Sequence, residues 1–307
     1  MMPANAKLRH VTVEKRQAAL AEYAENCPFN TVENAEGAKI GVITGGTSYL
    51  YAKEALGDRV GYLKLGMSYP LPTKLLKDFA EQYEKVYVIE ELDPVIETHC
   101  KALGLSVDGK NLFPMEGEFS QNLIRRVFGM EVKEGIAAEE AIPVRPPVMC
   151  AGCPHRGTFY VLKKLGLTVS GDIGCYTLGA VAPLMSVDTT ICMGASVSAA
   201  LGMAKARGVE FNKKLVSVIG DSTFMHSGIT ALVNISYNAS NSTVIILDNS
   251  ITGMTGHQQN PTTGFNLKGD PCAKIDLETL CRAVGINRVR VVDPYNLQQC
   301  DEVIKEE

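Results

Sequence analysis

Short apolar runs alternate with longer amphipathic stretches along most of the chain. From residue 39 the runs at 40–43, 60–65 and 86–89 have the apolar, β-branched character of buried strands. The stretches at 48–56 and 72–84 between them have helical periodicity. Because alternating strands and helices are typical of a parallel sheet covered by helices, this half of the chain is predicted to be an α/β domain.

The alternation resumes after a segment rich in proline and charge at residues 131–148. Helices are predicted at 158–165, 196–206 and 229–237, and strands at 167–170, 189–193, 215–219 and 243–247. Pro143, Pro146 and Pro147 block both helix and strand, so the proline-rich segment is interpreted as a linker. We therefore expect a helical connector at 1–36, an α/β domain at 37–130, the linker at 131–148 and a second α/β domain at 149–307.

Composition and charge exclude several classes of function. A net charge of −4 and the absence of a long Lys/Arg run give no footprint for nucleic acid. The chain has neither an apolar signal segment nor a run long enough to span a bilayer, which indicates a cytoplasmic protein. Nine cysteines without a secretory signal favour free thiols or metal ligands over disulfides.

Two polar motifs follow neighbouring predicted strands and carry the strongest chemical signal. They are Gly-Asp-Ser-Thr at 220–223 and Leu-Asp-Asn-Ser-Ile-Thr-Gly-Met-Thr-Gly at 247–256. Ligands of parallel sheets bind at the carboxyl ends of the strands. The Asp221 carboxylate, the Asn249 amide oxygen and the Ile251 carbonyl suit Mg²⁺, while Gly220 and the amides of Ser222 and Thr223 suit a diphosphate. Either motif alone is more simply a helix cap or a turn, but the pair on one βαβ unit favours a cofactor site.

Three cysteines form a second constellation, Cys150 and Cys153 in CAGCPHRG with Cys175 in DIGCYTLG. Three thiolates suit zinc or an iron–sulfur cluster, although CxxC is also common as a pair of reduced thiols. Three ligands do not close such a site. The candidates for a fourth ligand are Cys192, Cys272, Cys281 and His155, and nothing in the spacing selects one of them.

Seven segments, in order, resemble one family. Residues 150–160, 171–180, 220–232 and 248–261 look like the thiamine-binding domain of indolepyruvate ferredoxin oxidoreductase alpha subunits, in the 2-oxoacid:ferredoxin oxidoreductase superfamily. Residues 39–56, 63–72 and 86–97 are similar to the transketolase C-terminal-like domain that precedes it in that family. The resemblance implies two parallel-sheet α/β domains of these types over nearly the whole chain.

The resemblance also implies a set of site residues. Asp221, Asn249 and the Ile251 carbonyl would hold Mg²⁺ beside the diphosphate of thiamine diphosphate, and Cys150, Cys153 and Cys175 match cysteines that hold a [4Fe-4S] cluster in pyruvate-oxidising relatives. Met254 stands where those relatives carry a polar Asn, which leaves the substrate contacts there open. The implied cofactor-binding residues are Ile173, Gly174, Cys175, Tyr176, Gly220, Asp221, Ser222, Thr223, Asn249, Ile251, Met254, Thr255 and Gly256.

The activity that the resemblance implies is oxidative decarboxylation of an aryl 2-oxoacid such as indolepyruvate to an acyl-coenzyme A. Its partners would be a beta subunit of the same enzyme and ferredoxin, in an oligomer. The family's pyrimidine domain, with its catalytic glutamate, and its C-terminal ferredoxin-like domain are not recognised here, so the chain resembles an interior fragment. His226 and His257 are weak catalytic candidates, and Glu90–Glu91 is expected to be a solvated strand end.

Two alternatives to this activity stay open. The chain is alternatively a non-catalytic cofactor-binding and assembly fragment that needs a partner bearing the pyrimidine domain. It is also consistent with a non-oxidative thiamine-dependent decarboxylase or carboligase, which needs no cluster.

Overall fold

The computed structural model describes residues 2–132, 135 and 140–307, which fall into two compact units, residues 1–141 and 142–307. Part of the predicted linker, residues 133–134 and 136–139, lies outside the described residues. In the part that is described, no helix combines the length and the apolarity needed to cross a membrane. Each unit is an α/β structure, as the sequence predicts.

The first unit is built on a five-stranded sheet in the order β1-β3-β2-β4-β5. The central strands pair in parallel, and β1 runs antiparallel to β3 at one edge. This edge strand lies in the segment interpreted as a connector. The strands are β1 (Thr31–Glu33), β2 (Ile40–Gly45), β3 (Gly61–Leu65), β4 (Lys85–Ile89) and β5 (Val107–Asp108).

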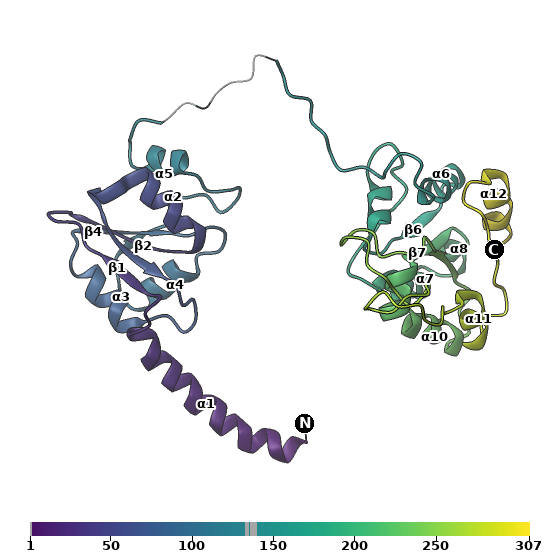
Figure 1. Ribbon diagram of the computed structural model, residues 1–307, viewed down its shortest axis with the longest axis horizontal. Helices are drawn as coiled ribbons and strands as arrows, with labels where there is room; N and C mark the ends of the chain where they lie inside the picture. Colours follow the sequence, from purple (N-terminus) through teal and green to yellow (C-terminus); the bar gives the residue numbers. More distant parts are fainter. Residues whose placement is uncertain (1, 133–134, 136–139) are drawn as a thin grey trace. The chain divides into compact units, whose positions relative to one another are not determined.

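Helices cover both faces of this sheet because the strand side chains alternate (Figure 1). Val42 and Tyr62 pack under α2 (Gly46–Leu56) and α5 (Gln121–Val127), and a 3₁₀ turn at Gly57–Arg59 follows α2. The next residues along the same strands, Ile43 and Leu63, pack against α3 (Thr73–Ala80) and α4 (Val95–Ala102) on the other face. The long first helix, α1 (Pro3–Glu25), buries only Ala24.

Glu90 is a helix cap and not a solvated strand end, so that expectation was wrong. Its side chain is 9% exposed, and its two carboxylate oxygens accept the backbone N–H groups of Ile96 and Glu97, each at 2.9 Å. The neighbouring Glu91 accepts the N–H of Phe119 at 2.7 Å. Glu90 thus caps the start of α4, and Glu91 fixes the loop before α5. Burial raises the pKa of Glu90.

The second unit contains a parallel three-stranded sheet in the order β6-β7-β8. Its strands are β6 (Thr168–Ser170), β7 (Leu215–Gly220) and β8 (Thr243–Leu247). The strand predicted at 189–193 was wrong, since its first residue makes only an isolated bridge to Ser170. Exposed residues follow, Ile191 among them at 70%, and Gly194 then turns the chain with φ of +87° into the next helix.

Two helical layers enclose this sheet as well. On one face Val216 and Val218 pack with Phe159 of α6 (His155–Leu165), and α12 (Leu297–Glu306) adds Ile304. On the other face Ile219 packs with residues of α7 (Ala195–Arg207), α10 (Ile229–Tyr237) and α11 (Leu277–Ala283). The other helices and helical turns of the unit are the 3₁₀ turn Cys175–Ala180, α8 (Val209–Asn212), α9 (Asp221–Thr223) and the π-helical turn Phe224–Gly228.

Replacing Phe159 by Ala is expected to destabilise the second unit by about 3–5 kcal/mol, because the side chain is fully buried against β6 and β7 and its removal leaves a cavity. Thermal or urea unfolding measures this loss. The control is Tyr160→Ala on the same helix, where the side chain is 54% exposed and a change within about 0.5–1 kcal/mol is expected. Equal losses in the two variants would contradict the placement of this helix.

Candidate functional site

The two motifs that follow β7 and β8 meet at the carboxyl end of the sheet. Gly220 and Leu247 are the last residues of these strands and lie opposite each other in the parallel register. The loop after β8 folds back onto the end of β7, where the hydroxyl of Thr252 lies 2.8 Å from that of Ser222. The sheet topology therefore unites the motifs as the sequence predicts.

Tyr176 brings the third motif to the same place. Its ring lies so close to Gly220 that a Cβ there would be 2.5 Å from a ring carbon. The phenol donates to the Ile173 carbonyl at 3.0 Å, and burial raises the pKa of Tyr176 to about 12. The sulfur of Cys175 would lie 3.6 Å from a Cβ at Gly253. Glycine at 220 is thus required by the close approach of an aromatic ring.

Asp172 fixes the loop that carries Cys175 and Tyr176. This fully buried carboxylate follows β6 and accepts three backbone N–H groups, from Ile173 at 2.9 Å, Gly194 at 2.7 Å and Ser196 at 2.9 Å. The last two begin α7, whose unpaired amides it satisfies. Sequence reasoning missed this role, although an Asp directly after a predicted strand is a recognisable signal.

Asp221 is the buried acid of the site, 3% exposed at the end of β7. Its Oδ2 accepts hydrogen bonds from the Asn260 amide at 3.1 Å and from the Thr262 hydroxyl at 2.9 Å. Sequence reasoning missed both partners. The local signal for them is Asn-Pro-Thr, a sequence suited to an Asx turn, within a polar loop.

His155 lies beside Asn249, one of the proposed Mg²⁺ ligands. Among the described residues it is not grouped with the three cysteines, for which it was a candidate fourth ligand. It is 5% exposed at the start of α6, and its Nε2 is 3.4 Å from the Asn249 amide nitrogen. Its ring meets that of Tyr176 edge to face, with centroids 6.1 Å apart. Burial lowers the pKa of His155, and the nearby Asp221 opposes this effect, so the neutral ring is favoured.

The oxygen groups at this crevice fit Mg²⁺ by their chemistry. Asp221 offers a carboxylate, Asn249 an amide and Ile251 a backbone carbonyl, all hard ligands. Asn249 accepts the N–H of Ile251 at 3.2 Å, which ties two of these groups into one turn. The helical run that begins at Asp221 turns its first amides toward the same strand end, and its π-helical segment follows directly.

The three cysteines do not form a ready metal site. Cys150 is exposed, while Cys153 and Cys175 are half-buried. Burial is the main cause that raises the pKa of Cys175, and the charges of Cys153 and Cys150 add to it, so the thiols lie near one another. Yet among the described residues no three His, Cys, Asp or Glu side chains are grouped to hold a metal ion. The three thiols as they lie here therefore do not form a complete set of ligands for a cluster.

The outer part of the predicted site is exposed. Met254 is 52% exposed, and Thr255 donates to the Gln258 side chain at 2.7 Å. His226 and His257 are also exposed, and Nδ1 of His226 lies 2.7 Å from the hydroxyl of its neighbour Ser227. Both histidines stay candidates only. Gly256, with φ of +114°, occupies a conformation that favours glycine.

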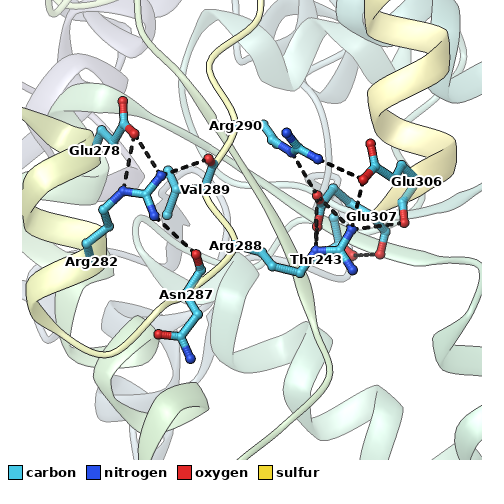
Figure 2. Close-up of polar contacts among 9 residues, drawn as sticks. All are labelled: Thr243, Glu278, Arg282, Asn287, Arg288, Val289, Arg290, Glu306 and Glu307. Atoms are coloured by element: carbon cyan, nitrogen blue, oxygen red, sulfur yellow. Dashed lines mark hydrogen bonds and ion pairs between the residues drawn. The ribbon is translucent and has the colours of Figure 1, made fainter.

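A cavity of about 740 Å³ lies elsewhere, along the free edge of β8. Residues 243–248 line one side and residues 285–292 the other, with Glu307 at the margin. Arg288 and Arg290 form ion pairs with Glu306 and Glu307 beside it (Figure 2). Because the cavity follows the length of the strand and touches the site only at its end, it is distinct from the crevice at the strand ends.

Comparisons with known proteins find a matching family model for a large part of each unit. Residues 172–307 match the model of the C-terminal TPP-binding domain of thiamine pyrophosphate enzymes, and residues 30–144 match the indolepyruvate oxidoreductase domain. The chain is 40% identical over 99% of its length to "Indolepyruvate oxidoreductase subunit IorA" of Archaeoglobus fulgidus and 38% identical to that of Thermococcus kodakarensis, covering 52% of each. It thus spans about half the length of these curated relatives.

A solved structure is also similar. It is 2-oxoglutarate:ferredoxin oxidoreductase from Magnetococcus marinus with 2-oxoglutarate, coenzyme A and succinyl-CoA bound. The match has 21% identity and a TM-score of 0.45, and it covers 53% of this chain and 60% of that one.

Replacing Asp172 by Asn is expected to destabilise the second unit by about 2–4 kcal/mol, because an amide group would face backbone N–H donors that the carboxylate now satisfies. Urea unfolding at neutral pH measures the loss. The control is Asp188→Asn, whose exposed carboxylate accepts one backbone N–H, from Val169, and where about 0.5–1.5 kcal/mol is expected. A loss no larger than the control's would refute the capping role of Asp172.

Proposed function

Since the chain belongs to the family of indolepyruvate oxidoreductase IorA subunits, we propose that its second unit holds thiamine diphosphate and Mg²⁺ for a 2-oxoacid oxidoreductase. The observation that carries the proposal is the meeting of three motifs at one strand end. Thr252 contacts Ser222 there, and Tyr176 lies against Gly220. The corresponding domain layout is 37–130 and 149–307, joined by the linker at 131–148.

Each group at the crevice has a proposed role. Asp221, the amide oxygen of Asn249 and the carbonyl of Ile251 bind the cation, whose charge offsets that of the diphosphate. The phosphate oxygens accept hydrogen bonds from Ser222 and Thr223 at the start of the helical run. Thr255 and Gly256 border the diphosphate from the loop after β8. Asp221 is buried and Asn249 is exposed, so the cation would join a fixed acid to a more accessible loop.

Residues 173–176 are proposed to border the reactive rings of the cofactor. Bound thiamine diphosphate supplies the electron sink that allows a 2-oxoacid to lose CO₂. The buried Tyr176 fills the space next to Gly220 and so keeps water away from the strand end. The Asp172 carboxylate holds this loop in place by accepting three backbone N–H groups, which gives it a structural role.

For the longer protein of which this chain matches about half, we propose oxidative decarboxylation of an aryl 2-oxoacid such as indolepyruvate. The acyl group passes to coenzyme A, and a pair of electrons passes to ferredoxin. The name of the relatives, "subunit IorA", supports a partner subunit, which we identify with the beta subunit of the same enzyme. The aryl substrate, the ferredoxin and the coenzyme A rest on the family resemblance.

Calorimetric titration of the purified chain with thiamine diphosphate tests the cofactor site. Binding is expected with Mg²⁺ and is expected to weaken at least about tenfold without it or in the Asp221→Ala variant, because a site that has lost the carboxylate assigned to the cation no longer holds it. Asp270→Ala is the matched control. That acid is exposed in the same long loop and bonds only to Asn266 among the described side chains, so affinity is expected to stay unchanged.

Two results would contradict the proposal in different ways. Equal binding by wild type and Asp221→Ala would mean that the diphosphate binds elsewhere. No binding by the wild-type chain would mean that this chain alone does not hold the cofactor. Repeating the titration on a subunit of the relatives' full length then separates a missing partner domain from a wrong site.

A further inference from the structure

A buried turn contacts the Asp221 carboxylate from within an otherwise exposed loop. Asn260 is 8% exposed and Thr262 fully buried, whereas residues 254–259 before them are exposed. Both side chains donate to the same carboxylate oxygen, Oδ2, at 3.1 and 2.9 Å. Since buried polar groups are costly unless paired, this pairing fixes where the loop returns to the sheet.

The orientation of both donors follows from the turn itself. The backbone N–H of Thr262 donates to Oδ1 of Asn260 at 2.8 Å, which leaves the amide nitrogen of Asn260 facing Asp221. The Thr262 hydroxyl has one proton and two oxygens in reach, Asp221 Oδ2 at 2.9 Å and Asn260 Oδ1 at 2.7 Å. The charged carboxylate is the stronger acceptor and Asn260 Oδ1 already has a donor, so the proton goes to Asp221.

The two oxygens of Asp221 are consequently unequal. Oδ2 accepts two hydrogen bonds, whereas Oδ1 accepts none from any group in the described part of the chain. An anionic oxygen with free lone pairs, on a side chain that is only 3% exposed, is the kind of ligand that a divalent cation takes. The hydrogen bonds from Asn260 and Thr262 occupy Oδ2, so Asp221 would bind a cation through Oδ1 alone.

The same loop carries the other groups assigned to the cation. It begins with Asn249 and Ile251, contacts Ser222 through Thr252, and returns to Asp221 through Asn260 and Thr262. The contact at Asp221 therefore ties the loop after β8, which carries these ligands, to the acid that follows β7. Partners that orient a metal ligand in this way tune its affinity for the metal.

We propose that Asn260 and Thr262 are positioning residues of the Mg²⁺ site, which hold Oδ2 of Asp221 and leave Oδ1 to bind the cation. This inference rests on the proposed function of the crevice and adds to it the groups that set metal affinity. Neither residue touches the cofactor in this assignment. Both act through Asp221.

The test compares Thr262→Val with Thr263→Val in the full chain. Thr263 is the adjacent matched residue, because its hydroxyl donates to the backbone carbonyl of Asn260 at 2.8 Å and does not contact Asp221. Each variant removes one threonine hydroxyl; that of Thr263 also accepts the N–H of Phe265 at 3.4 Å, so a purely structural role predicts an effect of Thr263→Val at least similar to that of Thr262→Val. Calorimetric titration with Mg²⁺ at saturating thiamine diphosphate gives the metal affinity, and thermal unfolding of the metal-free protein checks the fold.

The expected result is a roughly 10- to 100-fold weaker Mg²⁺ affinity in Thr262→Val, the loss typical of removing a group that orients a metal ligand. Thr263→Val is expected to bind Mg²⁺ as the wild type does. Thr262→Ser, which keeps the hydroxyl, is expected to restore most of the affinity. Asn260→Leu serves as a second variant if Thr262→Val does not fold, and the same weakening is expected.

Three outcomes overturn the inference. Equal Mg²⁺ affinities in Thr262→Val and Thr263→Val, or no recovery in Thr262→Ser, would show that Thr262 acts only on stability. In either case the proposed function survives if the wild type binds Mg²⁺ and Asp221→Ala does not. A wild-type chain that binds no Mg²⁺ with thiamine diphosphate overturns the inference and the proposed cofactor site together.

Discussion

The buried carboxylate of Asp172 is the constraint on which the arrangement of the second unit depends. It accepts hydrogen bonds from three backbone N–H groups, which need an acceptor because they are away from water. These bonds join the end of β6, the loop at 173–176 and the start of α7. With that loop fixed, Tyr176 lies against Gly220 and Cys175 against the loop after β8. Asp172, to which no step of the reaction is assigned, thus determines where Tyr176 and Cys175 lie in the site.

Local sequence was enough to predict the central elements of this site. The strands 215–219 and 243–247 and the helix 229–237 were predicted within a residue, because mostly apolar, β-branched runs and a helical period are local signals. Since parallel neighbours end at the same edge, the positions of Asp221 and Asn249 followed from that topology. The α/β class was predicted from the same local signals and is confirmed by the structure.

Other features depend on partners that are distant in sequence. Thr262 and Asp221 are 41 residues apart. The Asn-Pro-Thr sequence predicts a turn at 260–262, but it does not predict that the turn contacts Asp221. Glu90 was expected in solvent because its caps on α4 form only when the loop after β4 folds over it. Residues 189–193 have β-branched and apolar residues typical of a strand, but only Thr189 forms a bridge, to Ser170, and the exposed residues after it lead to the turn at Gly194, so a strand does not form. The CxxC spacing likewise predicted nearby thiols, but it could not predict how closely they are grouped.

The free edge of β8 has a consequence for handling the protein. A strand at the border of a sheet presents unpaired backbone groups, which act as a template for another strand, including one from a misfolded neighbour. Arg288 and Arg290 place positive charge beside this edge, but Glu306 and Glu307 neutralise much of it. Electrostatic repulsion between molecules is therefore weak at this edge. Dilute solutions and a buffer pH away from the isoelectric point are consequently the conditions under which the chain keeps its colloidal stability.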